Sequence, residues 1–324
     1  MIKHAIWISW ENQRRNRELS AALQIPLFEF CEIDRINNYL KKYIIGIAKT
    51  LYVLTKTRPR IVFCQNPSIV LSILIIGLKT IKDIRIVVDA HNAGLFPIDG
   101  HSEILNCASR IIQRYADLTI VTNEILKQHV DKNGGRAFVL QDKIPKLKPT
   151  RYKRLRGRYN ILFICTYADD EPYEIVFEAA KDIEKNIFIY VTGHFDKKGI
   201  NPSDLPENVV LTDYMPEEEY ISMLHSIDAT IDLTNRENCL VCGAYESIAA
   251  GKPMVLSKTR ALMEYFNKGA VYVKHTKDSI ANGIKEVLRR KEELTGQISN
   301  LRKIRLTEWQ EKKNKLEAII AESF

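Results

Sequence analysis

Two stretches of the chain carry side chains capable of chemistry at the end of a predicted strand. In the first, VVDAHN, an apolar strand over residues 86–89 ends at Ala90 and is followed by His91 and Asn92. Parallel strands of an α/β sheet place their carboxyl ends at the ligand-binding edge, so both side chains should lie there. An imidazole at that edge can act as a base or hold a sugar hydroxyl at neutral pH. We take His91 and Asn92 as catalytic candidates, with a purely structural histidine as the alternative.

The second stretch, TIDLTNRENCLVCGAYESIAAGKPMVLS, predicts a strand, a polar turn, a helix and a strand at residues 230–233, 234–238, 243–250 and 254–257. The helix opens with Gly243 and Ala244, whose backbone N–H groups lie at the positive end of the helix dipole and could bind a phosphate. Glu246 follows, and an ionised carboxylate accepts two hydrogen bonds, as the paired hydroxyls of a ribose would require. A plain strand-helix-strand without a ligand is the alternative.

Both stretches resemble glycosyltransferase motifs. The run NCLVCGAYESIAAGKPMVLS is similar to the nucleotide-sugar signature of GT-B glycosyltransferases, including family 4, in which two acids bracket seven residues before a small-small-Gly-x-Pro turn. The second acid falls on Glu246, but Asn238 stands eight residues earlier and the acid is at Glu237. DAHN resembles the Asp-x-His-Asn of β-mannosyltransferases that extend chitobiosyl-diphosphodolichol. The displaced acid leaves retention or inversion of stereochemistry open.

The resemblance implies an α/β fold of GT-B type, in which two Rossmann-like domains face a central cleft and the last helix crosses back to the N-terminal domain. Alternating strand and helix patterns in both halves agree with such sheets. The basic, proline-containing stretch 142–158 predicts a linker. We therefore expect an acceptor-binding domain at 1–145, a nucleotide-sugar-binding domain at 146–300 and a returning helix at 301–324.

The resemblance also assigns candidate residues to the two substrates. Acceptor contacts fall in the first turn, SWENQRRNREL, where guanidinium groups could bind a pyrophosphate bidentately, although a solvated helix start is equally open. The acceptor candidates are Glu11, Arg14 and Arg15. The donor candidates are Thr166, Asp170, Gly193, Tyr214, Arg236, Glu237, Asn238, Cys242, Gly243, Ala244 and Glu246.

Composition and cysteine spacing limit the other possibilities. A chain of 324 residues with 45% hydrophobic and 27% charged residues predicts a soluble protein of two domains. It opens on a strand pattern and not on a secretory signal, so we expect it in the cytoplasm. Cys239 and Cys242 form a CxxC without a second ligand pair, and the acids at 169–171 fit a helix start better than a metal site. We expect no metal and no cofactor.

The basic character of the chain predicts an anionic partner. Its net charge is +8 and its pI about 9.0. No nucleic-acid-binding motif accompanies the charge, which favours a membrane surface over a nucleic acid. The segments 38–57 and 68–79 carry more apolar side chains than one packing face needs, as in helices that lie in a membrane interface. Two well-buried sheet helices remain an equal alternative.

We therefore predict a hexosyltransferase. It would move a sugar from a UDP or GDP donor to a lipid-linked glycan acceptor, while bound peripherally to the inner face of the cell membrane. One alternative is a nucleotide-sugar 2-epimerase on the same fold. The other is a catalytically inactive membrane-surface scaffold, which the Asn238 substitution would suit.

Overall fold

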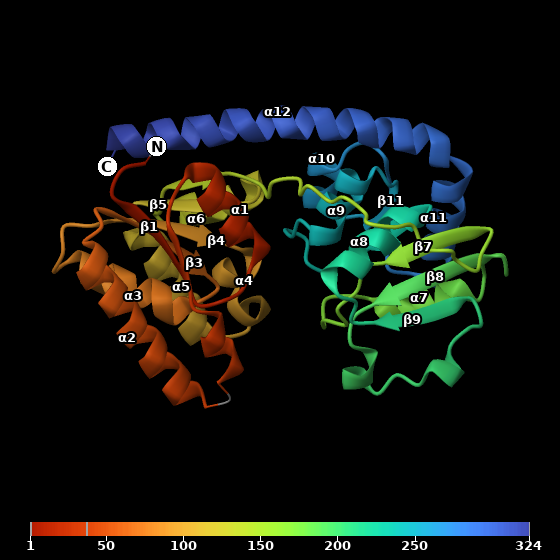
Figure 1. Ribbon diagram of the computed structural model, residues 1–324, viewed down its shortest axis with the longest axis horizontal. Helices are drawn as coiled ribbons and strands as arrows, with labels where there is room; N and C mark the ends of the chain where they lie inside the picture. Colours follow the sequence, from red (N-terminus) through yellow and green to blue (C-terminus); the bar gives the residue numbers. More distant parts are fainter. Residues whose placement is uncertain (1, 37, 324) are drawn as a thin grey trace. The chain divides into compact units, whose positions relative to one another are not determined.

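The computed structural model describes residues 2–36 and 38–323 of the chain, which form two compact units (Figure 1). The first unit consists of Met1–Lys143 together with Glu308–Phe324, and the second of Ile144–Thr307. Each unit is built around one six-stranded parallel sheet. Parallel sheets need helices on both faces, because each strand is connected to the next by a crossover.

The first sheet has the strand order β2-β1-β3-β4-β5-β6. The strands of the sheet are buried apolar runs, as expected where both faces are covered. They are β1 (Ala5–Ser9), β2 (Leu27–Glu29), β3 (Ile61–Asn66), β4 (Arg85–Ala90), β5 (Leu118–Val121) and β6 (Ala137–Val139). Because all six run in one direction, the residues after their carboxyl ends gather at one edge of the sheet.

The helices of the first unit form one layer on each face of this sheet. The helices are α1 (Arg14–Leu23), α2 (Tyr39–Thr57), α3 (Ile69–Lys79), α4 (Asn92–Leu95), α5 (Glu103–Tyr115) and α6 (Glu124–Lys132). Side chains of α2, α3, α5 and α6 form one apolar core with the sheet. Side chains of α1 and of the end of the last helix, α12 (Lys291–Ser323), form the core on the other face. Asn38 caps α2 by accepting a hydrogen bond from the backbone of Lys41.

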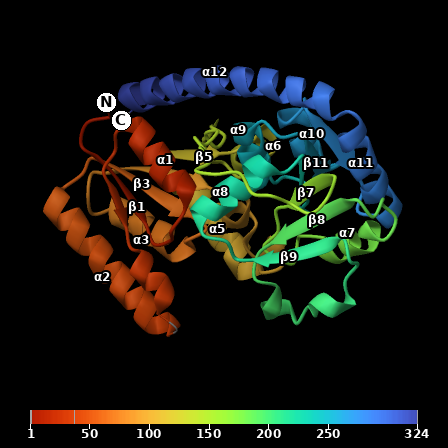
Figure 2. The same cartoon turned by 45° about the vertical axis from the view of Figure 1, so that its right-hand side comes forward.

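The second sheet has the order β12-β11-β10-β7-β8-β9, and β7, β8 and β9 are seen side by side in Figure 2. The strands are β7 (Tyr159–Phe163), β8 (Ile187–Thr192), β9 (Val209–Asp213), β10 (Ala229–Asp232), β11 (Met254–Ser257) and β12 (Ala270–Val273). The helices are α7 (Tyr173–Ala180), α8 (Glu217–Ser226), α9 (Cys242–Ala250), α10 (Arg260–Tyr265) and α11 (Lys277–Arg289).

The last helix, α12, contributes to both units. Its first part belongs to the second unit, where the Arg305 guanidinium lies 4.4 Å from the centre of the Tyr265 ring. Its last part belongs to the first unit, where Trp309 is buried and its Nε1 donates to the Gln141 carbonyl at 3.0 Å. The helix begins at Lys291 and continues through Gly296 into the segment 301–324 that was predicted to return to the first unit. Within residues 2–36 and 38–323, no helix is both long and apolar enough to cross a membrane.

Candidate active site

The carboxyl edge of the first sheet holds a cluster of buried polar side chains. Ser9 ends β1 and donates to Oε1 of Gln65 at 2.6 Å, and Nδ2 of Asn16 donates to the same oxygen at 2.7 Å. In the described part of the chain, Oδ1 of Asn16, Nε2 of Gln65 and Oδ1 of Asn66 have no hydrogen-bond partner. Each such buried atom costs about 1–3 kcal/mol. The fold alone does not account for this polarity, whereas a polar ligand at the same edge would.

Arg15 lies within this edge as the centre of a buried ion-pair network. Only 7% of the residue is exposed, and its Nε lies 3.0 and 2.9 Å from the two carboxylate oxygens of Asp89. Its other nitrogens donate to Asp142 and, at 2.9 Å, to the carbonyl of Leu140. Burial alone would lower the pKa of Arg15, but the two carboxylates more than reverse this and raise it.

The predicted role of Arg15 in binding an acceptor pyrophosphate is therefore corrected. Its guanidinium is buried and directed at protein oxygens, so it orders the edge and holds Asp89 without facing a ligand. Arg14, the first residue of α1, is exposed, and Glu11 lies in the preceding loop, where its Oε2 accepts from Gln13 at 3.1 Å. The sequence alone does not distinguish Arg14 from Arg15 by residue type.

His91 and Asn92 lie directly after β4, at the same edge. His91 precedes α4, and its side chain is 26% exposed with Nε2 3.8 Å from Oδ2 of Asp89. Burial is the main influence on its pKa and lowers it, Asp89 opposes this, and Arg15 supports it. The imidazole is thus neutral at pH 7, the form that a general base requires. Neither Nε2 of His91 nor Oδ1 of Asn92 has a hydrogen-bond partner among the described residues.

In the second unit, the loop after β7 is tied to the loop after β10. Asp170 accepts a hydrogen bond from Oγ1 of Thr234 at 2.5 Å and pairs with Nη1 of Arg236 at 3.1 Å. Thr166 is exposed, and its backbone N–H donates to Glu171 at 2.8 Å. The carboxylate of Glu171 therefore holds the turn that presents Thr166. Three predicted donor residues, Thr166, Asp170 and Arg236, are in this way brought to one edge of the sheet.

The ends of β8 and β9 add a glycine and an aromatic platform to this edge. Gly193 has a φ of +96°, and a Cβ on it would lie 2.5 Å from the carbonyl oxygen of Cys165, so only glycine fits there. The rings of His194 and Tyr214 are stacked with their centroids 5.1 Å apart. Nδ1 of His194 lies 3.2 Å from Asp213, and Tyr214 is 68% exposed. One face of an aromatic pair is thus available to a planar ligand.

The amino terminus of α9 contains an unexpected carboxyl group. Val241 precedes the helix without a side-chain cap, and Cys242, the first helical residue, is exposed. Asp232, the last residue of β10, is only 6% exposed, and a Cβ on Gly243 would lie 2.5 Å from its Oδ2. The backbone groups of Gly243 and Ala244, predicted to bind phosphate, therefore have the Asp232 carboxyl beside them. The phosphate contact predicted for these N–H groups stays a prediction.

The pKa of the Asp232 carboxyl is raised. Burial raises this pKa well above the ordinary aspartate value, and the nearby carboxylates of Glu171 and Glu246 raise it further. Hydrogen bonding with the backbone N–H groups of Gly243 and Ala244 opposes the rise but does not cancel it. Its Oδ2 has no hydrogen-bond partner among the described residues, which adds to the free-energy cost of ionising the group.

Glu246 lies on α9 one turn beyond Cys242, where one of its carboxylate oxygens accepts a hydrogen bond from the Tyr220 hydroxyl of α8. Glu237, the displaced acid of the signature, accepts from the backbone N–H of Arg260 at 2.8 Å at the start of α10. Glu237 thus stabilises a helix end, and Asn238 lies in the loop between that contact and α9.

Several residues of this edge were not foreseen from the sequence. Two of them make hydrogen bonds with predicted donor residues: Glu171 with Thr166, and Tyr220 with Glu246. His194 stacks on Tyr214, and Asp232 lies beside the α9 terminus. His194 was detectable, because it follows the strand-ending Gly193. The others act through partners remote in sequence. Over the described residues, no group of three or more histidine, cysteine, aspartate or glutamate side chains could hold a metal ion.

Comparisons with known proteins agree with this architecture. Residues 152–304, almost all of the second unit, match the family model described as glycosyl transferases group 1. The chain is similar in structure to sucrose-phosphate synthase from Thermosynechococcus elongatus, with a TM-score of 0.78, 12% identity and 98% of each chain covered. No curated protein matches the sequence.

Two further structures show the same likeness. Anabaena HepE in complex with UDP and glucose has a TM-score of 0.73 and 14% identity, covering 98% of this chain and 91% of the other. The OtsA apo structure has a TM-score of 0.75 and 10% identity, with 98% of each chain covered. The predicted α/β fold of two Rossmann-like units is confirmed. Residues 152–304 match the group 1 glycosyl transferase model, and the whole chain has the GT-B fold of two Rossmann-like units.

Proposed function

We propose that this protein is a hexosyltransferase that moves a sugar from a UDP or GDP donor, bound by the second unit, to a glycan acceptor bound by the first. The observation that carries the proposal is the polar edge of the second sheet, where Thr166, Asp170, Arg236 and Glu246 gather within the group 1 domain. UDP is supported further by the UDP and UDP-glucose complexes of the HepE structures.

Each part of a nucleotide sugar has a counterpart at this edge. The exposed ring of Tyr214, backed by His194, would stack on the base. Glu246 would accept hydrogen bonds from the ribose hydroxyls. The partly exposed guanidinium of Arg236 would contact the diphosphate. The nucleoside diphosphate is the leaving group, and the negative charge that develops on it during transfer needs such stabilisation. The glycine at position 193 would let the backbone approach the ligand closely.

The acceptor would bind at the carboxyl edge of the first sheet. His91, neutral and with its Nε2 unpartnered, would take the proton of the attacking hydroxyl. Asp89 would stabilise the imidazolium that results, although Arg15 already neutralises much of its charge. Asn92 and the buried amides nearby would hold neighbouring hydroxyls of the glycan.

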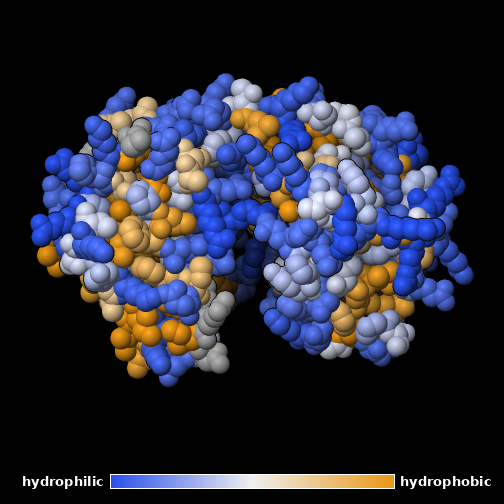
Figure 3. Space-filling view, viewed as in Figure 1, coloured by the Kyte–Doolittle hydropathy of each residue, from blue (hydrophilic) through white to orange (hydrophobic). Residues whose placement is uncertain are grey.

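The exposed face of α2 supports a lipid-linked acceptor at the inner surface of the cell membrane. Tyr39, Leu40, Ile44 and Tyr52 of this helix are 58–76% exposed. Lysines interleave them along the helix at positions 41, 42, 49 and 56. In Figure 3 a hydrophobic surface extends over this part of the first unit, with hydrophilic residues around it. Aromatic and aliphatic side chains flanked by lysines fit the boundary between acyl chains and anionic headgroups.

Donor turnover tests the enzymatic part of the proposal. The protein is incubated with UDP-glucose, UDP-N-acetylglucosamine and GDP-mannose, and release of UDP or GDP is followed with and without detergent extracts of lipid-linked glycans. Glu246→Gln should raise the KM for the donor about 10- to 100-fold, because a charge-assisted contact is lost. Glu184→Gln, an exposed acid of the same unit, is the matched control. Binding without nucleotide release would favour the scaffold, and C2 epimerisation of the sugar would favour the epimerase.

Vesicle flotation tests the membrane part. The protein should float with vesicles containing phosphatidylglycerol and less with pure phosphatidylcholine. The triple variant of Tyr39, Leu40 and Ile44 to serine should lose binding by about 10-fold or more, because each buried aliphatic side chain contributes about 1.5–3 kcal/mol. Ile81→Ser, which changes an equally exposed residue outside α2, should not. Equal flotation of all three proteins would refute the assignment.

A further inference from the structure

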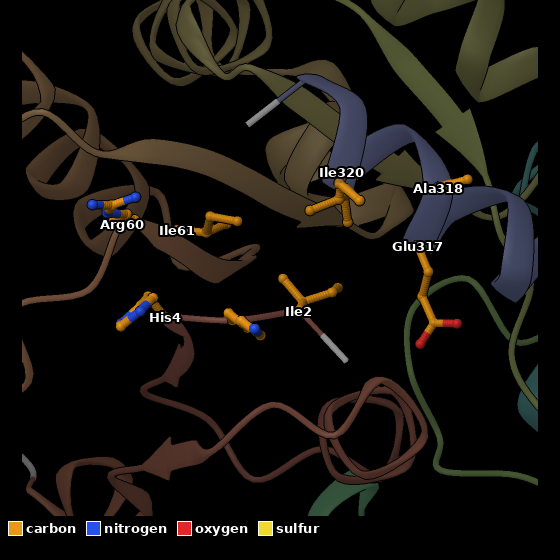
Figure 4. A pocket seen from close by; sticks show the side chains of 9 residues that line it. Ile2, His4, Arg60, Ile61, Glu317, Ala318 and Ile320 are labelled. Carbon is orange, nitrogen blue, oxygen red and sulfur yellow. The ribbon is translucent and has the colours of Figure 1, made fainter.

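A cavity of about 630 Å³ lies at the amino edge of the first sheet (Figure 4). It is formed where β1 and β3 begin and where the end of α12 packs on them. Ala5 pairs with Ile61 in the parallel register, so His4 and Arg60 are neighbours just before the two strands. The candidate acceptor residues follow the opposite ends of the same strands. The cavity is therefore a separate feature from the proposed acceptor site.

The lining of this cavity is apolar in the middle and basic on one side. Ile61 and Ile320 are almost fully buried and form its floor together with Ile2. Figure 4 shows His4 and Arg60 side by side at one end and Ile2 opposite Ile320 between the ends. The lining thus combines an aliphatic surface with a cationic end.

The basic side chains have no acidic partner in the protein. Neither Lys3, His4 nor Arg60 makes a side-chain hydrogen bond or ion pair with any residue in the ranges 2–36 and 38–323. The one acid of the lining, Glu317, pairs with Lys313 at 3.0 Å. In Figure 4 it lies at the end remote from His4 and Arg60. The ammonium group of Lys3 and the guanidinium of Arg60 are exposed and therefore open to an anionic ligand.

The backbone holds this basic end in place at a cost. His4 has a φ of +57°, which is uncommon for a residue with a side chain, and its carbonyl accepts from the backbone N–H groups of Arg60 at 2.9 Å and Ile61 at 3.2 Å. Such conformations cost about 1–3 kcal/mol and are concentrated at binding and catalytic sites. The strain fixes the imidazole of His4 beside the guanidinium of Arg60.

We propose that this cavity binds an amphipathic anion, an aliphatic chain that ends in a phosphate or carboxylate. The volume falls within the range of about 300–1,000 Å³ found for small-molecule sites. The chain would cover Ile2, Ile61 and Ile320, and the headgroup would lie against Lys3, His4 and Arg60. Among the described residues the lining holds no phenylalanine, tyrosine or tryptophan, and its apolar part is aliphatic, which favours an aliphatic chain over a nucleotide base.

Calorimetric titration of the full chain tests this proposal with dodecyl phosphate, dodecanoate, dodecanol and inorganic phosphate, each below its micelle concentration. We expect either long-chain anion to bind more tightly than dodecanol or inorganic phosphate, and the preferred headgroup to distinguish phosphate from carboxylate. The double variant Lys3→Gln/Arg60→Gln should weaken binding of the anion about 10- to 100-fold. Lys82→Gln changes a partly exposed lysine of the same unit; it is the control and should leave binding of the anion unchanged.

A second variant tests the apolar floor without touching the charges. Ala318 is exposed on α12 and lines the cavity, so Ala318→Trp should fill it and block the anion and dodecanol alike, with the melting temperature as a check on folding. Neither variant should change donor turnover. Binding of dodecyl phosphate that both variants leave intact, or no binding of any long-chain anion, would overturn the proposal. If the protein did not turn over a sugar donor, the result of the anion titration would still stand, because that titration does not depend on donor turnover.

Discussion

Replacing Asp232 by asparagine should make the second unit more stable than that of the native protein at neutral pH. The gain in stability should be smaller at acid pH. Asp232 is 94% buried at the start of α9, close against Gly243, with Oδ2 unpartnered. Burial holds its pKa well above the ordinary value, and Glu171 and Glu246 add to the effect. Asparagine has nearly the same shape as the neutral acid but cannot ionise. The substitution therefore removes one protonation equilibrium and little packing.

The sign of the effect follows from the raised pKa. In the unfolded chain Asp232 loses its proton near pH 3.9, whereas in the folded chain it keeps its proton at higher pH. Its contribution to stability is therefore complete below the unfolded pKa and is lost as pH rises toward the folded pKa. The loss is about 1.4 kcal/mol for each pH unit in which only the unfolded chain is ionised. For a unit of this size, that corresponds to about 3–6 °C in melting temperature per pH unit.

Thermal unfolding of the native protein and Asp232→Asn, measured from pH 5 to pH 8, gives this difference directly. The melting temperature of the variant minus that of the native protein should increase with pH. Asp204→Asn removes an exposed acid from the same unit and controls for the general loss of one negative charge. A difference that is constant, or that falls as pH rises, would show that Asp232 is ionised and stabilises the helix terminus as an anion, which would refute the reasoning.

Three further substitutions test other parts of the two edges. His91→Ala should lower kcat about 10²- to 10⁴-fold with little change in donor KM. Because the pKa of His91 is lowered, the activity of the native protein should persist to a lower pH than an ordinary histidine allows. Steady-state kinetics across pH test this, and a fall in activity near pH 6.5 would contradict it. Arg15→Leu should cost about 3–5 kcal/mol in urea unfolding, against less than about 1 for the half-exposed Arg17→Leu. Gly193→Ala should destabilise more than Gly199→Ala, because both have positive φ but only the first Cβ would clash; equal melting temperatures would refute the clash.

The alternation of strands and helices was predictable because most elements carry their own periodicity and end signals. The strand over Met254–Ser257 has the predicted bounds. The helix predicted from residue 38 begins where Asn38 caps it. Strand β6 was not predicted, since three residues show no alternation, and α10 has only six. Short elements of this kind form because a neighbouring strand or helix stabilises them.

The candidate residues were predictable as positions but not as roles. A residue that follows a parallel strand must lie at the carboxyl edge, so the order of elements alone predicts the position of His91 after β4, whereas Gly193 and Tyr214 were assigned through the family resemblance. What each side chain does there depends on its neighbours. Glu237 matched the acid of the signature by type, yet its carboxylate accepts the backbone N–H of Arg260 on another helix.

Arg15 and Asp232 show where the missing information lies. The helical period places Arg15 on the same face as Leu19 and Leu23, so its burial could have been inferred from the sequence. Its role could not, because a buried guanidinium is stable only with partners, and Asp89 and Asp142 are 74 and 127 residues away in the chain. Asp232 is the opposite case, since its strand position predicts burial but no cation among the described residues pairs with it, and its pKa is raised. Two acids in similar positions at the ends of parallel strands, Asp89 and Asp232, therefore have different electrostatic surroundings, because only Asp89 lies beside an arginine.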